Sequence, residues 1–154
     1  MGVPNSQKLT GQGAMTPAAA AQGLRLRAPI HLRTARTNCW KCHQDTLVQA
    51  LIAADVQDMG ESGQARSYVH GIVEPPHELL SSLRLLAPHL RLGPVDPDGH
   101  ARLCNHCEHC GAVQSDVYLF GEAAGPFFGR PPEGRLGALL IEHDLAVRDA
   151  EYFP

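Results

Sequence analysis

The stretch TNCWKCHQDT (residues 37–46) carries two cysteines, Cys39 and Cys42, separated by two residues. A C-x-x-C pair of this kind is typical of half a zinc site or of a redox dithiol. A redox dithiol usually lies where a strand runs into a long helix that opens at the pair and lowers the thiol pKa. Here the pair is followed by His-Gln-Asp-Thr and a segment without a clear helical start. The pattern favours metal binding, with thiol redox chemistry through Cys39 and Cys42 as a further alternative.

A second cysteine cluster, with Cys104, Cys107 and Cys110, lies in the stretch LCNHCEHCGAVQSD (residues 103–116), and 64 residues separate Cys42 from Cys107. Cys107 and Cys110 form the pair that best completes the site. Gly111 follows them and can take the left-handed backbone conformation that directs amides at a thiolate. Cys104 lies on the strand that leads into this cluster, where we expect a small buried side chain.

The two pairs together predict one structural zinc site, because Zn²⁺ prefers four tetrahedral ligands and thiolate sulfur at about 2.3 Å. The predicted ligands are Cys39, Cys42, Cys107 and Cys110. The C-x-x-C…C-x-x-C-G pattern favours zinc over an iron–sulfur cluster. The nearby histidines are expected to be neighbours of the metal and not ligands, since four thiolates are already present; they are His43, His106 and His109.

The charge of the chain is distributed unevenly. Its 154 residues carry a net charge of -3, yet residues 1–44 contain six basic side chains and no acid. We expect a flexible basic arm over residues 1–27, rich in Gly, Ala, Gln, Ser and Pro, and one domain over residues 28–154. No stretch approaches the ~20 apolar residues of a membrane-spanning helix, and no secretory signal is evident. The expected location is therefore cytoplasmic.

The hydrophobic pattern predicts an α+β fold, a split zinc ribbon in which short antiparallel strands flank the two cysteine pairs. The clearest element is a helix over about residues 76–88, whose leucines recur on one side and which begins beside a proline. Alternating apolar residues predict strands over residues 28–36 and 112–120. Residues 46–56 are read as a strand returning beside the first, and residues 136–147 as either a helix or a strand.

The cysteine motifs carry a resemblance to a known group. NCWKC (residues 38–42), NHCEHCGAVQSD (residues 105–116) and GPFF (residues 125–128) resemble the motifs of small uncharacterised bacterial proteins with a split zinc ribbon. The resemblance spans about residues 28–130 and implies the same four zinc ligands. The chain has Ser115 where the pattern of the group has glycine. No established activity comes with this resemblance.

Catalytic motifs are weak in this chain. His77-Glu78 begins like H-E-x-x-H, but Ser81 stands where the second histidine would be. His143-Asp144 resembles a general-base pair on an apolar segment that we interpret as surface. A closed four-thiolate zinc leaves no position for water or substrate. We therefore expect a protein that is not an enzyme.

Two aromatic features have alternative interpretations. Trp40 and the pair Phe127-Phe128 either pack around the knuckles or form an exposed recognition patch. The expected function is protein interaction or scaffolding, with an unknown protein as partner. Nucleic-acid binding through the basic arm is the alternative, because a basic segment can contact an anionic polymer.

Overall fold

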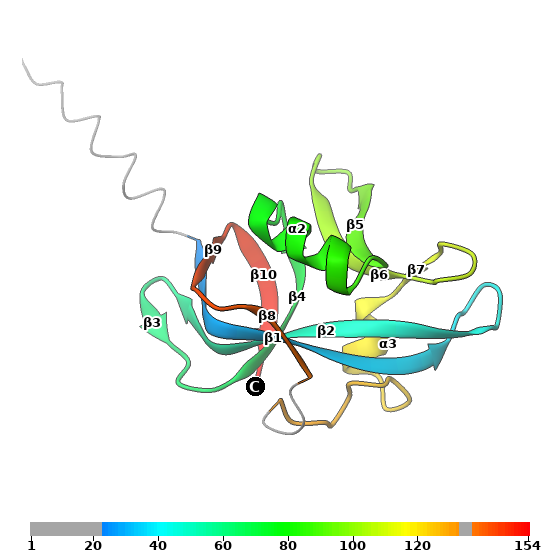
Figure 1. Cartoon of the computed structure of the whole chain (residues 1–154), viewed down its shortest axis with the longest axis horizontal. Coiled ribbons are helices and arrows are strands. Elements are labelled where there is room, and N and C mark those ends of the chain that lie inside the picture. Colours follow the sequence, from blue (N-terminus) through cyan, green and yellow to red (C-terminus); the bar gives the residue numbers. More distant parts are fainter. Residues whose placement is uncertain (1–22, 133–136) are drawn as a thin grey trace, which may run out of the picture.

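The protein is built on antiparallel β-sheet. The computed structural model describes residues 23–132 and 137–154, and within them ten strands join one sheet that is accompanied by two helices (Figure 1). The strands are β1 (Leu24–Asn38), β2 (Asp45–Asp58), β3 (Glu61–Ser62), β4 (Ser67–Val73), β5 (Leu90–Val95), β6 (Ala101–His106), β7 (Val113–Gln114), β8 (Ala138–Ile141), β9 (Leu145–Val147) and β10 (Asp149–Phe153). The helices are α2 (His77–Leu86) and α3 (Asp116–Gly121).

The long hairpin of β1 and β2 is the backbone of the sheet. The two strands pair without interruption from Ile30 opposite Ala53 to Asn38 opposite Asp45. The first cysteine pair lies in the turn at this end of the hairpin (Figure 1). The structure thus confirms both predicted strands and makes each of them longer than expected.

The C-terminal strands close the sheet on itself. Strand order along the main path is β5-β6-β4-β2-β1-β8. In addition β9 pairs with β1, whereas β10, which follows after Arg148 alone, pairs with β4. Strand pairing therefore leads from β1 through β2 and β4 to β10. The chain then connects β10 to β9, which pairs with β1 again. This closure leaves few open sheet edges in the described part of the chain.

Two hydrophobic cores lie on opposite sides of β2. Leu51 and Ala53 face the larger core, which receives Leu79 and Leu83 from α2. Alternate residues of β2 face a smaller core with side chains of β4, α3 and the loop after it; this core consists of Val48, Ala50, Ile52, Tyr68, Leu119, Phe120 and Phe127. Because both faces of β2 are covered, its sequence is almost continuously apolar instead of alternating. This burial explains why LVQALIAADV suits a strand as well as a helix.

The predicted fold class is wrong. The described residues form one large antiparallel sheet with two short helices, and not an α+β zinc ribbon with a few short strands. The strand predicted over residues 112–120 is also wrong, because the strand covers Val113–Gln114 alone and α3 begins at Asp116. The predicted helix near residues 76–88 is confirmed as α2. Of the two alternatives for residues 136–147, the described part is strand, in β8 and β9.

The predicted arm falls mostly outside the described residues. Residues 1–22 are not described, whereas β1 already begins at Leu24, inside the stretch assigned to the arm. Leu24 and Leu26 are buried in the larger core, and Arg25 and Arg27 point outward. This alternation places the last residues of the expected arm in the sheet.

Candidate metal centre

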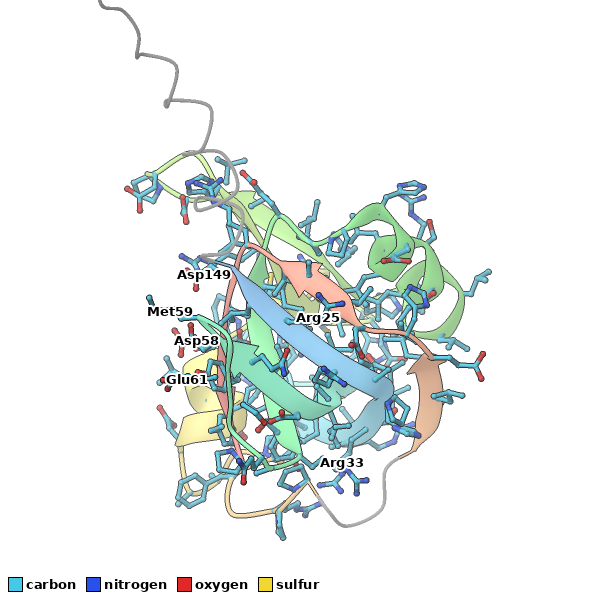
Figure 2. All side chains as sticks on the ribbon, turned by 90° about the vertical axis from the view of Figure 1, so that its left-hand side faces the viewer. Arg25, Arg33, Asp58, Met59, Glu61 and Asp149 are labelled. Atoms are coloured by element: carbon cyan, nitrogen blue, oxygen red, sulfur yellow. The ribbon has the colours of Figure 1, made fainter. Side chains whose placement is uncertain are left out.

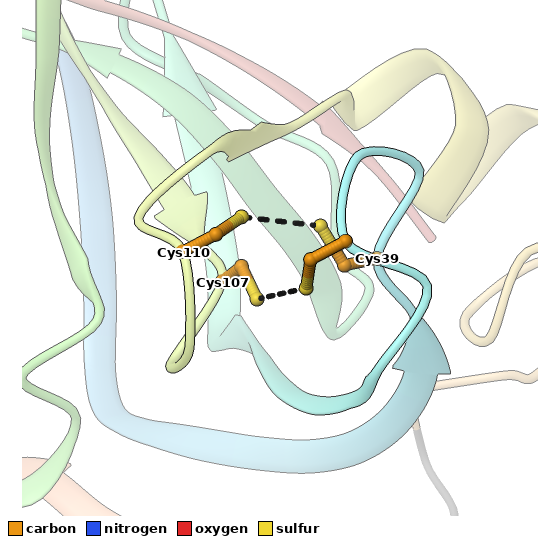
Figure 3. A group of neighbouring side chains, drawn as sticks. Cys39, Cys107 and Cys110 are labelled. Atoms are coloured by element: carbon orange, nitrogen blue, oxygen red, sulfur yellow. Dashed lines mark hydrogen bonds between the residues drawn. The ribbon is translucent and has the colours of Figure 1, made fainter.

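The four predicted cysteines come together at one end of the molecule. The sulfur of Cys39 lies 3.7 Å from that of Cys110, and the sulfur of Cys42 lies 3.7 Å from that of Cys107 (Figure 3). All four sulfurs lie within 4.8 Å of one another, which is close enough to hold a metal ion. A tetrahedron with metal–sulfur bonds of about 2.3 Å has edges of about 3.8 Å, so the observed spacing suits a tetrahedral thiolate site. It is far longer than the ~2.05 Å bond of a disulfide.

The two pairs are built as matching turns. In the first, the amide of His43 donates to the carbonyl of Cys39 over 3.0 Å and the amide of Lys41 donates to its sulfur over 3.3 Å. In the second, Gly111 and His109 make the equivalent bonds to Cys107, at 3.0 and 3.3 Å. Both turns therefore aim backbone N–H groups at a cysteine sulfur, which stabilises a thiolate.

The residue after each pair takes the left-handed backbone conformation. Gly111 has φ 76°, as the sequence led us to expect, and His43 has φ 63°. Left-handed φ is uncommon for residues with a side chain, although histidine is among the more tolerant. The first turn thus has the geometry of the second despite lacking its glycine.

The sulfurs differ in their affinity for protons. Burial acts to raise the pKa of Cys39, but hydrogen bonds from the amides of Cys42 and Lys41 outweigh it and lower the pKa to about 6. For Cys42 an amide hydrogen bond from Gln44 acts to lower the pKa, but burial and the adjacent sulfurs raise it to about 11. At neutral pH the metal-free cluster would hold both thiolate and thiol. Metal binding must then displace protons, which makes the affinity depend on pH.

Each turn is bonded to the strand that follows the other turn. The indole N–H of Trp40 donates to the carbonyl of Val113 in β7 over 2.8 Å. The second turn contacts β2 in return: the Glu108 carboxylate accepts from the amide of Leu47 over 2.7 Å, and the Glu108 amide donates to the Thr46 hydroxyl over 3.0 Å. The turns are therefore joined by these polar contacts as well as by the sulfurs.

A buried amide completes the surroundings of the sulfurs. Gln114 is 2% exposed and donates from Nε2 to the sulfur of Cys39 over 3.3 Å and to the carbonyl of Ala112 over 2.9 Å. A hydrogen bond of this kind orients a ligand and stabilises its negative charge. Sequence reasoning did not identify Gln114 as part of the site. Its position only four residues after Cys110 could have indicated a side chain close to the sulfurs.

The other predicted residues lie around the centre without joining it. The metal-binding group contains no histidine. His109 bonds through Nε2 to the carbonyl of Asp45, and buried His106 bonds through Nδ1 to the carbonyl of Cys104. Cys104 is half-buried in β6, where burial, followed by the nearby charge of Asp116, raises its pKa to about 11. A thiol with so high a pKa is unreactive at neutral pH.

Of the aromatic side chains considered above, one packs in a core and two are exposed. Phe127 is fully buried in the smaller core, whereas Trp40 is 64% exposed at the tip of the first turn and Phe128 is exposed.

The two residues of the candidate general-base pair His143-Asp144 have different partners. His143 contacts Glu78 at 2.6 Å, and the carboxylate of Asp144 accepts a hydrogen bond from the amide of Ala28. The two residues therefore do not act as one general-base pair in this structure.

No family model, curated protein or solved structure matches this chain. The resemblance to split-ribbon proteins therefore stays a prediction. Among the described residues no helix has the length and hydrophobicity needed to cross a membrane.

Proposed function

We propose that this is a zinc-binding protein in which one Zn²⁺ has a structural role, and that the protein acts by binding another protein. The observation that carries the first part is the closed group of four cysteine sulfurs. Four thiolates fill a tetrahedral coordination sphere, so that water or substrate would find no open position. The donor set favours soft metals, and among these zinc suits a tetrahedral all-sulfur site best.

The location of the centre supports a structural role. The cluster joins the turn of the β1–β2 hairpin to the segment between β6 and β7 (Figure 3). Neither cysteine pair lies at the start of a helix, because the first joins two strands and the second precedes the short strand β7. A helix start is the usual means of activating a redox dithiol. The placement of the two pairs therefore supports a structural site over a redox dithiol.

Exposed apolar side chains support protein binding. Trp40 is 64% exposed at the tip of the first turn, and Val117 is 71% exposed at the start of α3. Aromatic residues are enriched in the buried centres of protein interfaces. Trp40 is held by its bond to Val113, so its ring would enter an interface with little further loss of side-chain entropy.

The arginines of β1 do not form a free basic surface. Arg25 and Arg27 lie within 3.4 and 3.2 Å of the Asp144 carboxylate, and Arg36 lies within 2.5 Å of that of Asp45. Figure 2 shows Arg25 and Arg33 along β1, with Asp58, Glu61 and Asp149 at the left of the view. The first 44 residues contain no acid, so the carboxylates that pair with these arginines, Asp45 and Asp144, come from later in the chain. This pairing favours a protein partner over nucleic acid.

The metal is tested first. Mass spectrometry under native conditions should find one zinc per chain, and a strong chelator should remove it and unfold the protein. Purified protein that is folded and free of metal would contradict a structural role.

The partner class is tested separately. The full chain is titrated with duplex DNA and with single-stranded RNA over a range of salt concentrations. A protein-binding function predicts no binding at low salt, whereas affinity that falls steeply with salt would indicate contacts to phosphates and overturn the proposed partner class.

A further inference from the structure

A concavity with a cavity volume of about 530 Å³ lies between β4, α3 and β10. We call it the His70 groove, and its chemistry depends on His70, Asp116, Phe120, Phe153, Glu151 and Arg102. Its volume is in the range of small-molecule sites, roughly 300–1,000 Å³. No residue of the metal centre lines it.

The wall of the groove is aromatic. The imidazole of His70 stacks on the ring of Phe120 with 4.3 Å between centroids and 8° between planes. The ring of Phe153 meets both edge-on, at 6.0 Å from His70 and 5.9 Å from Phe120. The three rings at these spacings hold one another in place, and the partly exposed ring of Phe153 is where a flat ligand can pack.

A histidine–carboxylate pair lies in this wall. Nδ1 of His70 is 3.1 Å from Oδ2 of Asp116, and both side chains are partly buried, at 14% and 23% exposure. In a neutral imidazole whose Nδ1–H donates to the carboxylate, Nε2 presents a lone pair. Among residues 23–132 and 137–154, Nε2 has no hydrogen-bond partner. The groove therefore offers an oriented acceptor to a ligand N–H or O–H.

The backbone beside this pair leaves room for a ligand. Gly71 lies inside β4 with φ 62°, a conformation that side chains seldom adopt, and Gly121 also lines the groove. A glycine inside a buried strand often marks a place where a ligand or another backbone approaches closely. A side chain at Gly71 would begin 3.7 Å from the Asp116 carboxylate.

The charges of the groove select the class of ligand. The guanidinium of Arg102 is already engaged, with its Nε 3.5 Å from Asp96 and its Nη1 3.5 Å from the carbonyl of Gly71. Within the part of the chain that the structure describes, Glu151 has no cationic partner, and Asp116 forms its ion pair with His70. The available charge is therefore negative, beside the partly exposed ring of Phe153, since aromatic rings attract cations.

We propose that the His70 groove is a binding site for a small aromatic cation whose N–H groups donate to Asp116, Glu151 and Nε2 of His70. The ring of the ligand packs against Phe153 beside the stacked pair of His70 and Phe120, and its charge lies beside the two carboxylates. This site is independent of the proposed zinc function, since no residue of the metal centre lines it, although Val117 lies both at its edge and among the side chains that support protein binding.

Three probes of one shape test the proposal: benzamidine, which is cationic, benzamide, which is neutral, and benzoate, which is anionic. Each is titrated into the full chain with its metal bound, and binding is followed by two-dimensional NMR of the backbone amides. Benzamidine should shift the resonances of Gly71, Gly121 and Phe153, with a Kd on the order of 1 mM that is ordinary for so small a ligand. Benzamide should bind at least about fivefold more weakly and benzoate still more weakly, because the groove carries negative charge.

Two variants separate ligand contact from folding. Glu151→Gln and Asp116→Asn should each weaken benzamidine about three- to tenfold, while Glu142→Gln, which removes an exposed charge outside the groove, should leave the Kd unchanged. Glu151 is exposed, so its variant keeps the test valid if Asp116→Asn does not fold. Equal or tighter binding of benzoate would overturn the proposal. So would the absence of benzamidine-induced shifts at the groove in the folded protein.

Discussion

The indole nitrogen of Trp40 donates a hydrogen bond to the carbonyl oxygen of Val113 over 2.8 Å. This bond joins the tip of the first cysteine turn to the strand that follows the second turn. Glu108, in the second turn, bonds to the backbone of β2 in the same reciprocal manner. Segments 64 residues apart in the chain are thus held together by polar contacts as well as by the four sulfurs. These contacts add to the stability that the metal is expected to supply at this end of the fold.

Replacing Trp40 by phenylalanine tests the polar contact. Trp40→Phe keeps an aromatic ring and removes the indole N–H, so the Val113 carbonyl loses its donor. Because this region is open to water, the cost should be low, about 0.5–1 kcal/mol of unfolding free energy. Urea unfolding of the metal-bound protein measures it. A loss above about 2 kcal/mol would show that the ring itself is needed for packing, contrary to its 64% exposure.

Removing a metal ligand should have a far larger effect. Cys39→Ser and Cys110→Ser each leave three thiolates in the cluster. Metal binding at structural zinc sites is worth about 10–16 kcal/mol in small peptides, which equals or exceeds the whole stability of an ordinary domain. We expect both variants to lose zinc and to unfold, as measured by metal content and circular dichroism.

Cys104→Ser is the matched control for these two variants. Its sulfur lies outside the group of four and packs beside Gly93, where a β-carbon would come within 2.5 Å of it. The smaller hydroxyl fits the same space, so the variant should keep its zinc and its fold. Loss of metal from Cys104→Ser alone would show that the ligand set is wrong.

Gln114 should tune the metal affinity without being a ligand. Gln114→Ala removes the donor to the sulfur of Cys39 and should weaken zinc about 10- to 100-fold in a competition with a chromogenic chelator. Gln114→Glu should be worse, because it places a carboxylate beside a thiolate. Gln57→Ala, at the other end of β2, should leave the affinity unchanged. Unaltered zinc binding in both Gln114 variants would remove any role of this side chain at the metal.

Local patterns were enough to predict the elements next to the cysteines. The turns, both strands of the hairpin and α2 each carry their signal within a short window. The strand predicted over residues 112–120 failed because Val113, Val117 and Leu119 happen to be spaced by even numbers. Ser115 and Asp116 are also typical of a helix start, and the structure exposes Val117 while burying Leu119 and Phe120, as one short helical turn does.

The fold class could not be read from these windows, because it depends on pairing between distant segments. Leu24 pairs with Val147, and Tyr68 pairs with Phe153. Nothing in either partner's own sequence specifies the other, since any apolar strand edge can pair. The same holds for His70 and Asp116, which are 46 residues apart and meet only because α3 packs over β4.

Asp144 should make stability depend on acidity. A hydrogen bond from the amide of Ala28, followed by Arg25 and Arg27, lowers the pKa of this carboxyl. A lowered pKa in the folded state stabilises the fold at pH values above the ordinary aspartate pKa of about 3.9, and this stabilisation is lost as the pH falls further. Asp144→Asn should therefore cost about 1 kcal/mol at pH 7, and the difference from the native chain should shrink towards pH 3. Urea midpoints measured across this range check it; a difference that does not vary with pH would mean that the charge of Asp144 contributes nothing.

Two leucines of α2 provide a matched test of the larger core. Leu83 is 1% exposed and packs in that core, whereas Leu85 is 85% exposed on the same helix. Truncating a buried leucine removes its transfer free energy and leaves a cavity, so Leu83→Ala should cost about 2–5 kcal/mol of unfolding free energy. Leu85→Ala makes the same chemical change in water, where the better helix propensity of alanine leaves the cost within about 0.5 kcal/mol. Denaturant unfolding of both variants with zinc bound measures the difference. Because α2 also contacts β5 and β8, a small cost for Leu83→Ala would mean that the helix is held by those strands and not by its buried face.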